Sequence, residues 1–426
     1  MLDLKFIREN PDAIRQSLAN RGSTVDLDAI LALDAERRQA LQDVERLKQE
    51  RNASSKEIGL RKRAGEDTED IQATVRAQGE SIAALDQRIR VLETELEDRL
   101  LTIPNRPAAV APIGPDASGN QVVKTVGKPR RFDFDPLPHV ELAERLGLVD
   151  FGRAAKISGA GFAAYTGVGA RLERALVQFM LDIHTTEHGY HEISPPFLVN
   201  RAAMTGTGQL PKMAEDMYAV PADDLFLVPT AEVPVTNLFR DEIMDRPLPV
   251  KLVAYTPCFR REAGAAGRDT RGLIRMHQFD KVELVKFVEP ETSYDELEDL
   301  LGHAETILQR LELPYRVLEL CTGDLSFAAA RCYDIELWAP GQNDWLEVSS
   351  CSNFEDFQAR RARIRYRPEG GKPQFVHTLN GSGVALARLY VAILENYQNA
   401  DGSVTVPAAL RPYLGGLERI ESPVST

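Results

Sequence analysis

The 426-residue sequence is poor in cysteine and contains no long apolar run. Its four cysteines are too sparse for a disulfide framework and lack the close paired spacing of a zinc site. No segment approaches the roughly 20 apolar residues that a membrane helix needs, and the first residues lack the order of a signal peptide. We therefore expect reduced thiols, no zinc, no membrane association and a cytoplasmic location.

Positive charge is also in short supply. The chain has 51 Lys and Arg against 64 Asp and Glu, which gives a net charge of −13. This balance excludes a protein that coats nucleic acid indiscriminately, so any RNA contact must use a local basic patch. The length predicts two or three domains, and 43% hydrophobic residues are ample for a large buried core.

A change in composition divides the chain. A long helical pattern ends at residues 103–107, and a stretch rich in proline and glycine runs to about Arg131. We predict a helical domain at 1–103, a linker at 104–131 and a second domain at 132–426. Gly65 marks a turn inside the first domain, which predicts an antiparallel coiled-coil hairpin over about 27–102. Its apolar seam comprises Ile82, Leu85, Ile89, Leu92 and Leu96, with a thinner seam of Leu41, Val44 and Ile58.

Charge is distributed unevenly along this hairpin. Residues 36–63 carry nine Lys and Arg against five acids, whereas residues 66–99 carry ten acids against four arginines. Pairing between the helices explains part of the asymmetry. We expect the residues at the tip, Arg61, Lys62 and Arg63, to lie beyond most partners and to remain free for phosphate. A dimerisation element, the commoner use of a coiled coil, would favour evenly mixed charges.

The second domain alternates helices and strands. An amphipathic helix is predicted from Gly169 to about Glu187, followed by a strand at Ile193–Val199. Further apolar strands are predicted at Leu225–Val228, Lys251–Tyr255, Val282–Val288, Tyr315–Leu320 and Asp334–Trp338. This pattern indicates an α+β fold with a largely antiparallel sheet flanked by helices.

The most informative residues are Arg275, Phe279 and Glu283. On an extended strand their even spacing would place a phosphate-binding guanidinium, a purine-stacking ring and a carboxylate on one face. A solvated helix face is the alternative. Arg388 favours the first interpretation, because it follows a run of small residues that leads into a predicted helix at Leu389–Gln398. Two separate arginines would then meet one polyphosphate.

Several longer segments carry a family resemblance. Residues 206–212, 230–234, 262–283 and 377–382, together with the hairpin, resemble the bacterial seryl-tRNA synthetases, which are class II aminoacyl-tRNA synthetases. The resemblance covers essentially the whole chain. It implies a class II core of antiparallel sheet flanked by helices, and activation of L-serine with ATP to seryl-adenylate. Serine would then pass to the 3′ end of tRNA(Ser), and charging of tRNA(Sec) stays open.

The resemblance also implies residue roles. Arg260 and Arg388 would be catalytic, with Arg260 bridging the α-phosphate and the serine carboxylate. ATP would contact Arg260, Arg261, Glu262, Arg275, Phe279, Glu347, Val348, Ser349, Ser350 and Arg388. Serine would contact Thr230, Ala231, Glu232, Arg260, Glu283, Asn380 and Ser382. Glu347 and Ser350 would hold Mg²⁺ through hard oxygen donors.

Partners are implied in the same way. The arm would grip tRNA by shape and backbone, with Arg46, Lys48, Arg51, Lys56 and Arg61 as candidates and Arg268 and Arg271 at the acceptor stem. The helix from Gly169 and the strand at Ile193–Val199 would form the interface of a homodimer. Alternatives remain: a ligase that loads amino acids onto a carrier protein, a paralogue conferring antibiotic self-resistance, and an inactive RNA-binding relative.

Overall fold

The computed structural model describes residues 1–263 and 272–422, which form two compact units. One unit comprises Leu2–Ala19 and Ser23–Pro104, and the other comprises Met1, Asn20–Gly22 and the chain from Asn105 onward. Within the described residues, no helix combines the length and apolar character needed to cross a membrane.

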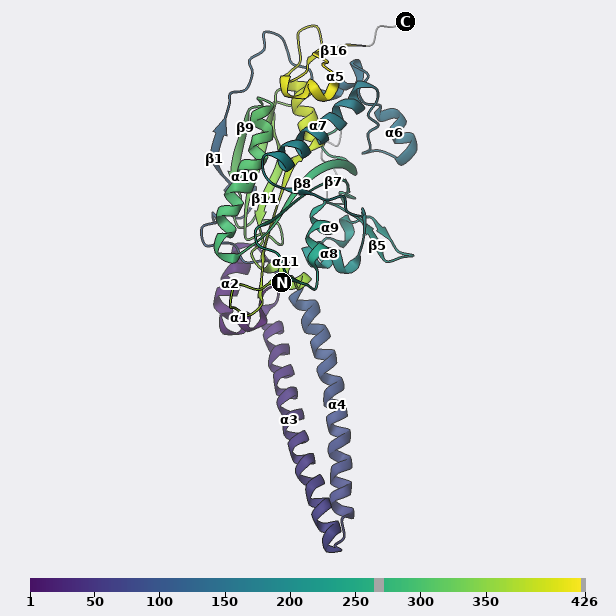
Figure 1. The fold of residues 1–426 in the computed structure, drawn as a ribbon, viewed down its shortest axis with the longest axis vertical. Coiled ribbons are helices and arrows are strands. Elements are labelled where there is room, and N and C mark those ends of the chain that lie inside the picture. Colours follow the sequence, from purple (N-terminus) through teal and green to yellow (C-terminus); the bar gives the residue numbers. More distant parts are fainter. Residues whose placement is uncertain (264–271, 423–426) are drawn as a thin grey trace. The chain divides into compact units, whose positions relative to one another are not determined.

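The N-terminal unit is built around two long antiparallel helices (Figure 1). They are α3 at Leu27–Ala64 and α4 at Glu69–Leu100, and they follow α1 at Leu4–Glu9 and α2 at Pro11–Asn20. Gly65 ends α3 in the left-handed region, with φ +76°, and its N–H caps the last carbonyls of the helix. The predicted hairpin and its turn are confirmed.

One residue predicted to lie in the apolar seam between α3 and α4 is exposed in the structure. Ile82 and Ile89 on α4 pack against Ala40 and Val44 on α3. Leu41, expected in the seam, is 41% exposed. Ala40 and Val44 are four residues apart and share a helix face, so the residue next to Ala40 is turned away by about 100°.

The second unit contains an eight-stranded sheet in the order β1-β9-β10-β11-β14-β8-β7-β2. The pairs are antiparallel except β2 with β7, as the sequence predicts. The strands are β1 Gln121–Val126, β2 His191–Glu192, β7 Val250–Phe259, β8 Gln278–Val288, β9 Tyr315–Glu319, β10 Arg331–Ala339, β11 Asp344–Asn353 and β14 His377–Ala385.

The longest helices that pack against this sheet are α7 at Val168–Thr186, α10 at Ser293–Arg310 and α12 at Leu386–Asn396 (Figure 1). Their buried apolar side chains join those of the strands in one large core. Two shorter helices, α5 at His139–Arg145 and α6 at Phe151–Ser158, precede α7.

Smaller elements complete the unit. One small sheet combines β3 Leu198–Asn200, β4 Ala219–Val220 and β5 Leu225–Leu227, another β6 Ile243–Met244, β12 Arg365–Tyr366 and β13 Gln374–Phe375, and a third β15 Val404–Thr405 and β16 Arg419–Ile420. The short helices are α8 Arg201–Thr207, α9 Glu232–Thr236 and α11 Phe357–Ala362. Single 3₁₀ turns lie at Ala117–Gly119, Ala214–Asp216, Asn237–Phe239, Pro290–Thr292, Ala408–Leu410 and Pro412–Leu414.

Two predicted segments differ from the structure. The interval 104–131 is more than a linker, because Gln121–Val126 pairs with β9 at the edge of the large sheet. The predicted strand at Ile193–Val199 is wrong, since strand structure is confined to His191–Glu192 and Leu198–Asn200. Pro195 and Pro196 lie between them, and proline has no N–H with which to continue a ladder.

Candidate active site

A cavity of about 550 Å³ is lined by side chains from β8, β11 and β14 and from the start of α12. The side chains that surround it come from segments far apart in the sequence, which only the folded sheet brings together. Most of the predicted site residues line it: Thr230, Glu232, Arg260, Glu262, Arg275, Phe279, Glu283, Glu347, Val348, Ser350, Asn380, Ser382 and Arg388.

Three predicted site residues are not part of this lining. Arg261 is exposed, and its backbone N–H bonds Asp216 instead. Ser349 is buried and donates its hydroxyl to the carbonyl of Ser382 at 2.6 Å. Ala231 is fully buried in a small apolar core. Ser349 faces away from the site because neighbouring side chains on a strand such as β11 point to opposite faces, whereas Arg261 and Ala231 lie just outside β7 and α9.

One end of the cavity is rich in arginine. Arg388 donates through Nε to the carbonyl of Ile274 at 3.2 Å and through Nη1 to the carbonyl of Glu347 at 2.6 Å. Arg275 forms an ion pair with Glu262. These acceptors hold two guanidinium groups at one end of the cavity, where they are suited to a polyphosphate.

Arg275 and Arg388 reach this end by routes that differ from the prediction. Arg275 lies before β8, because His277 donates its N–H to Gly161 at 2.9 Å and the ladder with β7 begins only at Gln278. Arg388 lies in the first turn of α12, which begins at Leu386 instead of Leu389. The two arginines still line the same cavity.

Arg260 lies beside the predicted purine platform. Its guanidinium carbon is 5.2 Å from the centroid of the Phe279 ring, and its Nε donates to the carbonyl of Pro229 at 3.3 Å. This arrangement leaves the remaining guanidinium N–H groups available to a ligand anion.

The other end of the cavity is acidic and mostly buried. Glu283 is 2% exposed, accepts a hydrogen bond from Ser382 Oγ at 3.3 Å and pairs with Lys281 Nζ at 2.6 Å. Lys281 is not among the residues predicted from the sequence. The alternation of β8 is the signal that could have found it, because it lies between Phe279 and Glu283 on the same strand face.

Glu232 is the second carboxyl group at this end. Burial, reinforced by the nearby charge of Glu283, raises the pKa of Glu232 to about 7. Gln358, also missed from the sequence, donates to Glu232 Oε1 at 2.6 Å and accepts from Thr378 Oγ1 at 2.7 Å. Two buried carboxyl groups, of which Glu283 is paired with Lys281, are suited to a cationic amine beside a hydroxyl.

The predicted metal ligands lie together on β11. Ser350 donates its hydroxyl to Glu347 Oε1 at 3.2 Å, and the same oxygen lies 3.6 Å from Arg388 Nη1. Across the ladder Asp334 is paired with Ser350, and burial together with the charge of Glu347 raises the pKa of Asp334 to about 8. Among the described residues no cluster of His, Cys, Asp and Glu could hold a metal by itself. These hard oxygens fit Mg²⁺ only if phosphate supplies further ligands.

The predicted tRNA contacts on the arm fall into two groups. Arg46 pairs with Asp43 and Glu50, Lys48 with Asp86, and Arg61 with Glu57 and Asp70. The expectation that Arg61 is free is therefore wrong. Over the described ranges, the basic residues of α3 that form no ion pair are Arg51, Lys56, Lys62 and Arg63.

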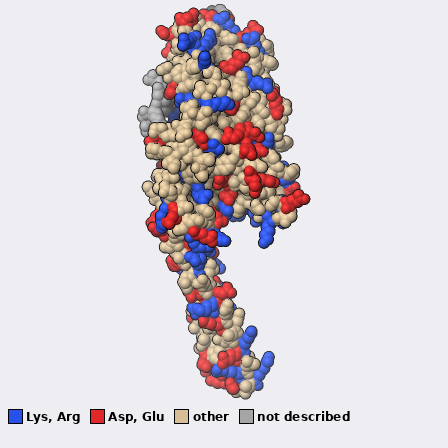
Figure 2. All heavy atoms as spheres, turned by 90° about the vertical axis from the view of Figure 1, so that its left-hand side faces the viewer, with Lys and Arg blue, Asp and Glu red and all other residues tan. Residues whose placement is uncertain are grey.

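The two groups lie close together on the arm. Figure 2 shows basic side chains near its tip, with acidic ones beside them. The other two candidates, Arg268 and Arg271, lie outside the described residues.

Sequence comparison with known proteins finds the family that the site residues indicate. A sequence model of the seryl-tRNA synthetase N-terminal domain matches residues 1–107, and one of the class II tRNA synthetase core domain (G, H, P, S and T) matches residues 218–397. A serine–tRNA ligase of Pelotomaculum thermopropionicum is 59% identical over 421 residues, which cover 99% of this chain and 100% of that protein.

Two solved structures that resemble this chain belong to the same family as the sequence relatives. A seryl-tRNA synthetase from Pyrococcus horikoshii complexed with ATP has a TM-score of 0.95 at 39% identity, covering 99% of this chain and 100% of that one. A cytoplasmic serine–tRNA ligase from Naegleria fowleri in complex with AMP has a TM-score of 0.90 at 29% identity, covering 99% of both chains. The chain therefore belongs to the seryl-tRNA synthetases, the class II serine–tRNA ligases.

Proposed function

We propose that this protein activates L-serine with ATP and transfers the activated serine to tRNA(Ser). The observation that carries the proposal is one cavity with an arginine end and a buried carboxylate end, joined by Arg260 and Phe279. Each end matches one reactant. The structure of the Pyrococcus relative complexed with ATP supports the nucleotide.

The main task of such a site is to bring two anions together. The carboxylate of serine must attack the α-phosphorus of ATP, and the two groups repel each other. Arg260, which lies beside Phe279, would serve as the bridge, while Arg275 and Arg388 would neutralise the outer phosphates. A carboxylate is already a nucleophile at neutral pH, so alignment and electrostatic stabilisation carry the rate without a general base.

Mg²⁺ belongs to this proposal as a bound partner of ATP. Glu347 and Ser350 would hold it, and their hydroxyl and carboxylate oxygens are the donors that this ion prefers. When bound, it would neutralise phosphate charge. Glu347 would then exchange its ion pair with Arg388 for the metal.

Selectivity for serine follows from the buried polar end. The hydroxyl of serine would complete the hydrogen bonds of Glu283 and Ser382, and its ammonium would face Glu232. Alanine would leave these groups unpaired, which costs about 1 to 3 kcal/mol for each group. Threonine would be rejected by its extra methyl group.

The other partners are proposed from the family and from the arm. The N-terminal hairpin, with its unpaired basic residues on α3, supports binding of tRNA(Ser) through the phosphate backbone. Charging of tRNA(Sec) stays open. A homodimer and a cytoplasmic location stay predictions.

ATP–pyrophosphate exchange tests the proposal. We expect exchange with serine, and much less with alanine, threonine or glycine, followed by charging of purified tRNA(Ser). Exchange without charging of tRNA would favour a ligase for a carrier protein. Absence of any exchange would indicate an inactive RNA-binding relative and overturn the proposal. Antibiotic self-resistance would show as activity that persists in the presence of a seryl-tRNA synthetase inhibitor.

A further inference from the structure

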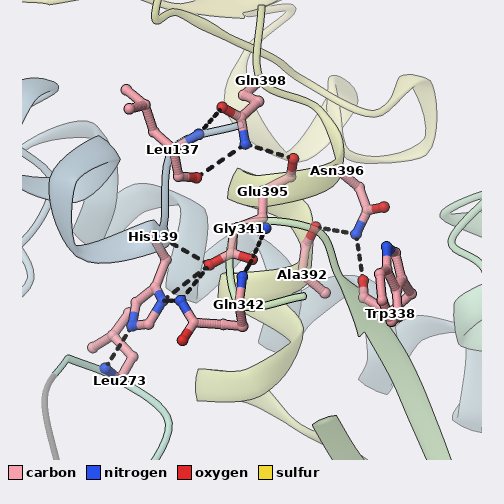
Figure 3. Close-up of polar contacts among 10 residues, drawn as sticks. All are labelled: Leu137, His139, Leu273, Trp338, Gly341, Gln342, Ala392, Glu395, Asn396 and Gln398. Carbon is pink, nitrogen blue, oxygen red and sulfur yellow. Dashed lines mark hydrogen bonds and ion pairs between the residues drawn. The ribbon is translucent and has the colours of Figure 1, made fainter. Parts of the chain in front are cut away.

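A buried carboxyl group lies about two helical turns after Arg388 on α12. Glu395 on α12 is fully buried, and both of its oxygens accept hydrogen bonds (Figure 3). Oε1 accepts from the backbone N–H of His139 at 2.8 Å and from Gln342 Nε2 at 3.1 Å. Oε2 accepts from the backbone N–H of Gly341 at 2.9 Å and of Gln342 at 3.3 Å. Fixed donors therefore stabilise this buried carboxyl group.

The imidazole of His139 extends this network. Its Nδ1 lies 3.1 Å from Glu395 Oε1, and its Nε2 lies 3.1 Å from the backbone nitrogen of Leu273 (Figure 3). The N–H of Leu273 can only donate, so Nε2 must be the acceptor and Nδ1 must carry the proton. Glu395 therefore fixes the tautomer that lets His139 hold Leu273.

The held segment belongs to the wall of the cavity. Leu273, Ile274 and Arg275 line the cavity in succession. Ile274 offers its carbonyl to Arg388 Nε at 3.2 Å, and Arg388 and Glu395 lie on the same helix, α12. One helix thus holds this segment twice, directly through Arg388 and indirectly through Glu395 and His139.

Close packing shows how tightly the segment is held. A Cβ on Gly272 would lie 2.2 Å from His139 Nε2 and 2.5 Å from a methyl carbon of Val140, and Gly272 has φ +76°. Only glycine fits this approach without displacing the imidazole. The backbone beside Arg275 is therefore fixed by both contact and hydrogen bonding.

We propose that His139 is a positioning residue for ATP binding, which acts by holding Leu273 so that Arg275 faces the polyphosphate opposite Arg388. The inference rests on the proposed function, since it concerns the same nucleotide end of the cavity. His139 does not line the cavity, so its effect on ATP passes through the backbone of residues 273–275.

Two substitutions separate the two hydrogen bonds of the ring. The amide of His139→Asn reaches the place of Nδ1, so it keeps the donor to Glu395 and loses the acceptor for Leu273. The longer amide of His139→Gln reaches the place of Nε2 and keeps that acceptor. We expect His139→Asn to raise KM for ATP about tenfold, the cost of one good hydrogen bond, and to leave KM for serine within about twofold. His139→Gln should restore most of the ATP affinity.

Exchange kinetics and thermal unfolding should be measured together. His303→Asn is the matched control, because His303 is a partly buried histidine bonded to Tyr190 outside the cavity lining, and its loss should not change KM for ATP. A folded His139→Asn variant with unchanged KM for ATP would overturn the inference. Equal losses for ATP and serine in both His139 variants would also overturn it, since that result marks a general structural role. Lack of serine-dependent exchange in the unaltered protein would instead count against the proposed function.

Discussion

At the scale of single residues, Glu232 predicts a pH dependence for serine binding. Burial raises the pKa of its carboxyl group to about 7. The ammonium of serine favours the ionised carboxylate, so binding is weakened where Glu232 is protonated. KM for serine should therefore rise about tenfold as the pH falls from 8 to 6, and it should level off at higher pH.

Glu232→Gln provides the control for this prediction. Its amide cannot ionise, so KM for serine should be high and nearly independent of pH over the same range. The steady-state KM from exchange assays at several pH values is the measurement. A flat profile in the unaltered protein, or the same slope in Glu232→Gln, would contradict the assignment of the titration to this residue.

The contacts of Arg388 predict that a positive charge alone is not enough for the reaction of ATP at the arginine end of the cavity. Its guanidinium bonds the carbonyls of Ile274 and Glu347 while it faces the cavity. Lysine keeps the charge but has no planar fork with which to bond these carbonyls and a phosphate together. Arg388→Lys should lower kcat/KM for ATP by about 100-fold or more.

The matched control for this change is Arg310→Lys, which alters an exposed arginine paired with Glu187 at 2.7 Å. It should leave the exchange kinetics unchanged, because surface ion pairs contribute little. Wild-type kcat/KM in Arg388→Lys would show that a point charge suffices there.

Residue chemistry is predicted from the sequence better than residue orientation. The guanidinium, ring and carboxylate of Arg275, Phe279 and Glu283 do meet in one cavity. Lys281 escapes prediction although the alternation of β8 places it on the strand face of Phe279 and Glu283, because the sequence does not show that this lysine is buried. Arg261 is wrongly included because a linear motif does not show which residues face away from the site.

At the scale of elements, the unpaired basic residues of α3 predict where tRNA binds. Arg51, Lys56, Lys62 and Arg63 form no ion pair within the part of the chain that the structure describes. Replacing all four by Gln should raise KM for tRNA(Ser) at least about tenfold. The slope of log K for tRNA binding against log salt concentration should also become shallower, by about one unit for each phosphate that the arm no longer neutralises.

This prediction separates the arm from the catalytic site. ATP–pyrophosphate exchange should be unchanged in the fourfold variant, because the substitutions lie in the other compact unit. Arg99→Gln is the control on the same hairpin, where the arginine is already paired with Glu95 at 3.0 Å. If Arg99→Gln weakens charging as much as the fourfold variant, net charge and not a defined surface governs tRNA binding.

Elements differ in how far the sequence predicts them. The hairpin is predicted well because its apolar spacing and Gly65 are local signals. The edge strand Gln121–Val126 escapes prediction because its burial pattern is almost wholly exposed, so it shows no alternation. Its strand structure depends on pairing with β9, a partner far away in the sequence.

At the scale of the whole molecule, the family predicts a homodimer formed through the region that follows α7. There the structure has two adjacent large apolar side chains, with Phe197 38% exposed and Leu198 44% exposed. Covering such a pair with a second copy of the chain would remove apolar surface from water. We expect a solution mass of twice the chain mass at micromolar concentration.

Replacing both Phe197 and Leu198 by Ser tests which surface is responsible. The double variant should dissociate on dilution at concentrations where the unaltered protein stays dimeric, as measured by analytical ultracentrifugation. Ile157→Ser is the matched control, because Ile157 is an equally large apolar residue, 81% exposed on α6. A single-chain mass for the unaltered protein would refute the dimer. Dissociation of Ile157→Ser but not of the double variant would place the interface on a different surface.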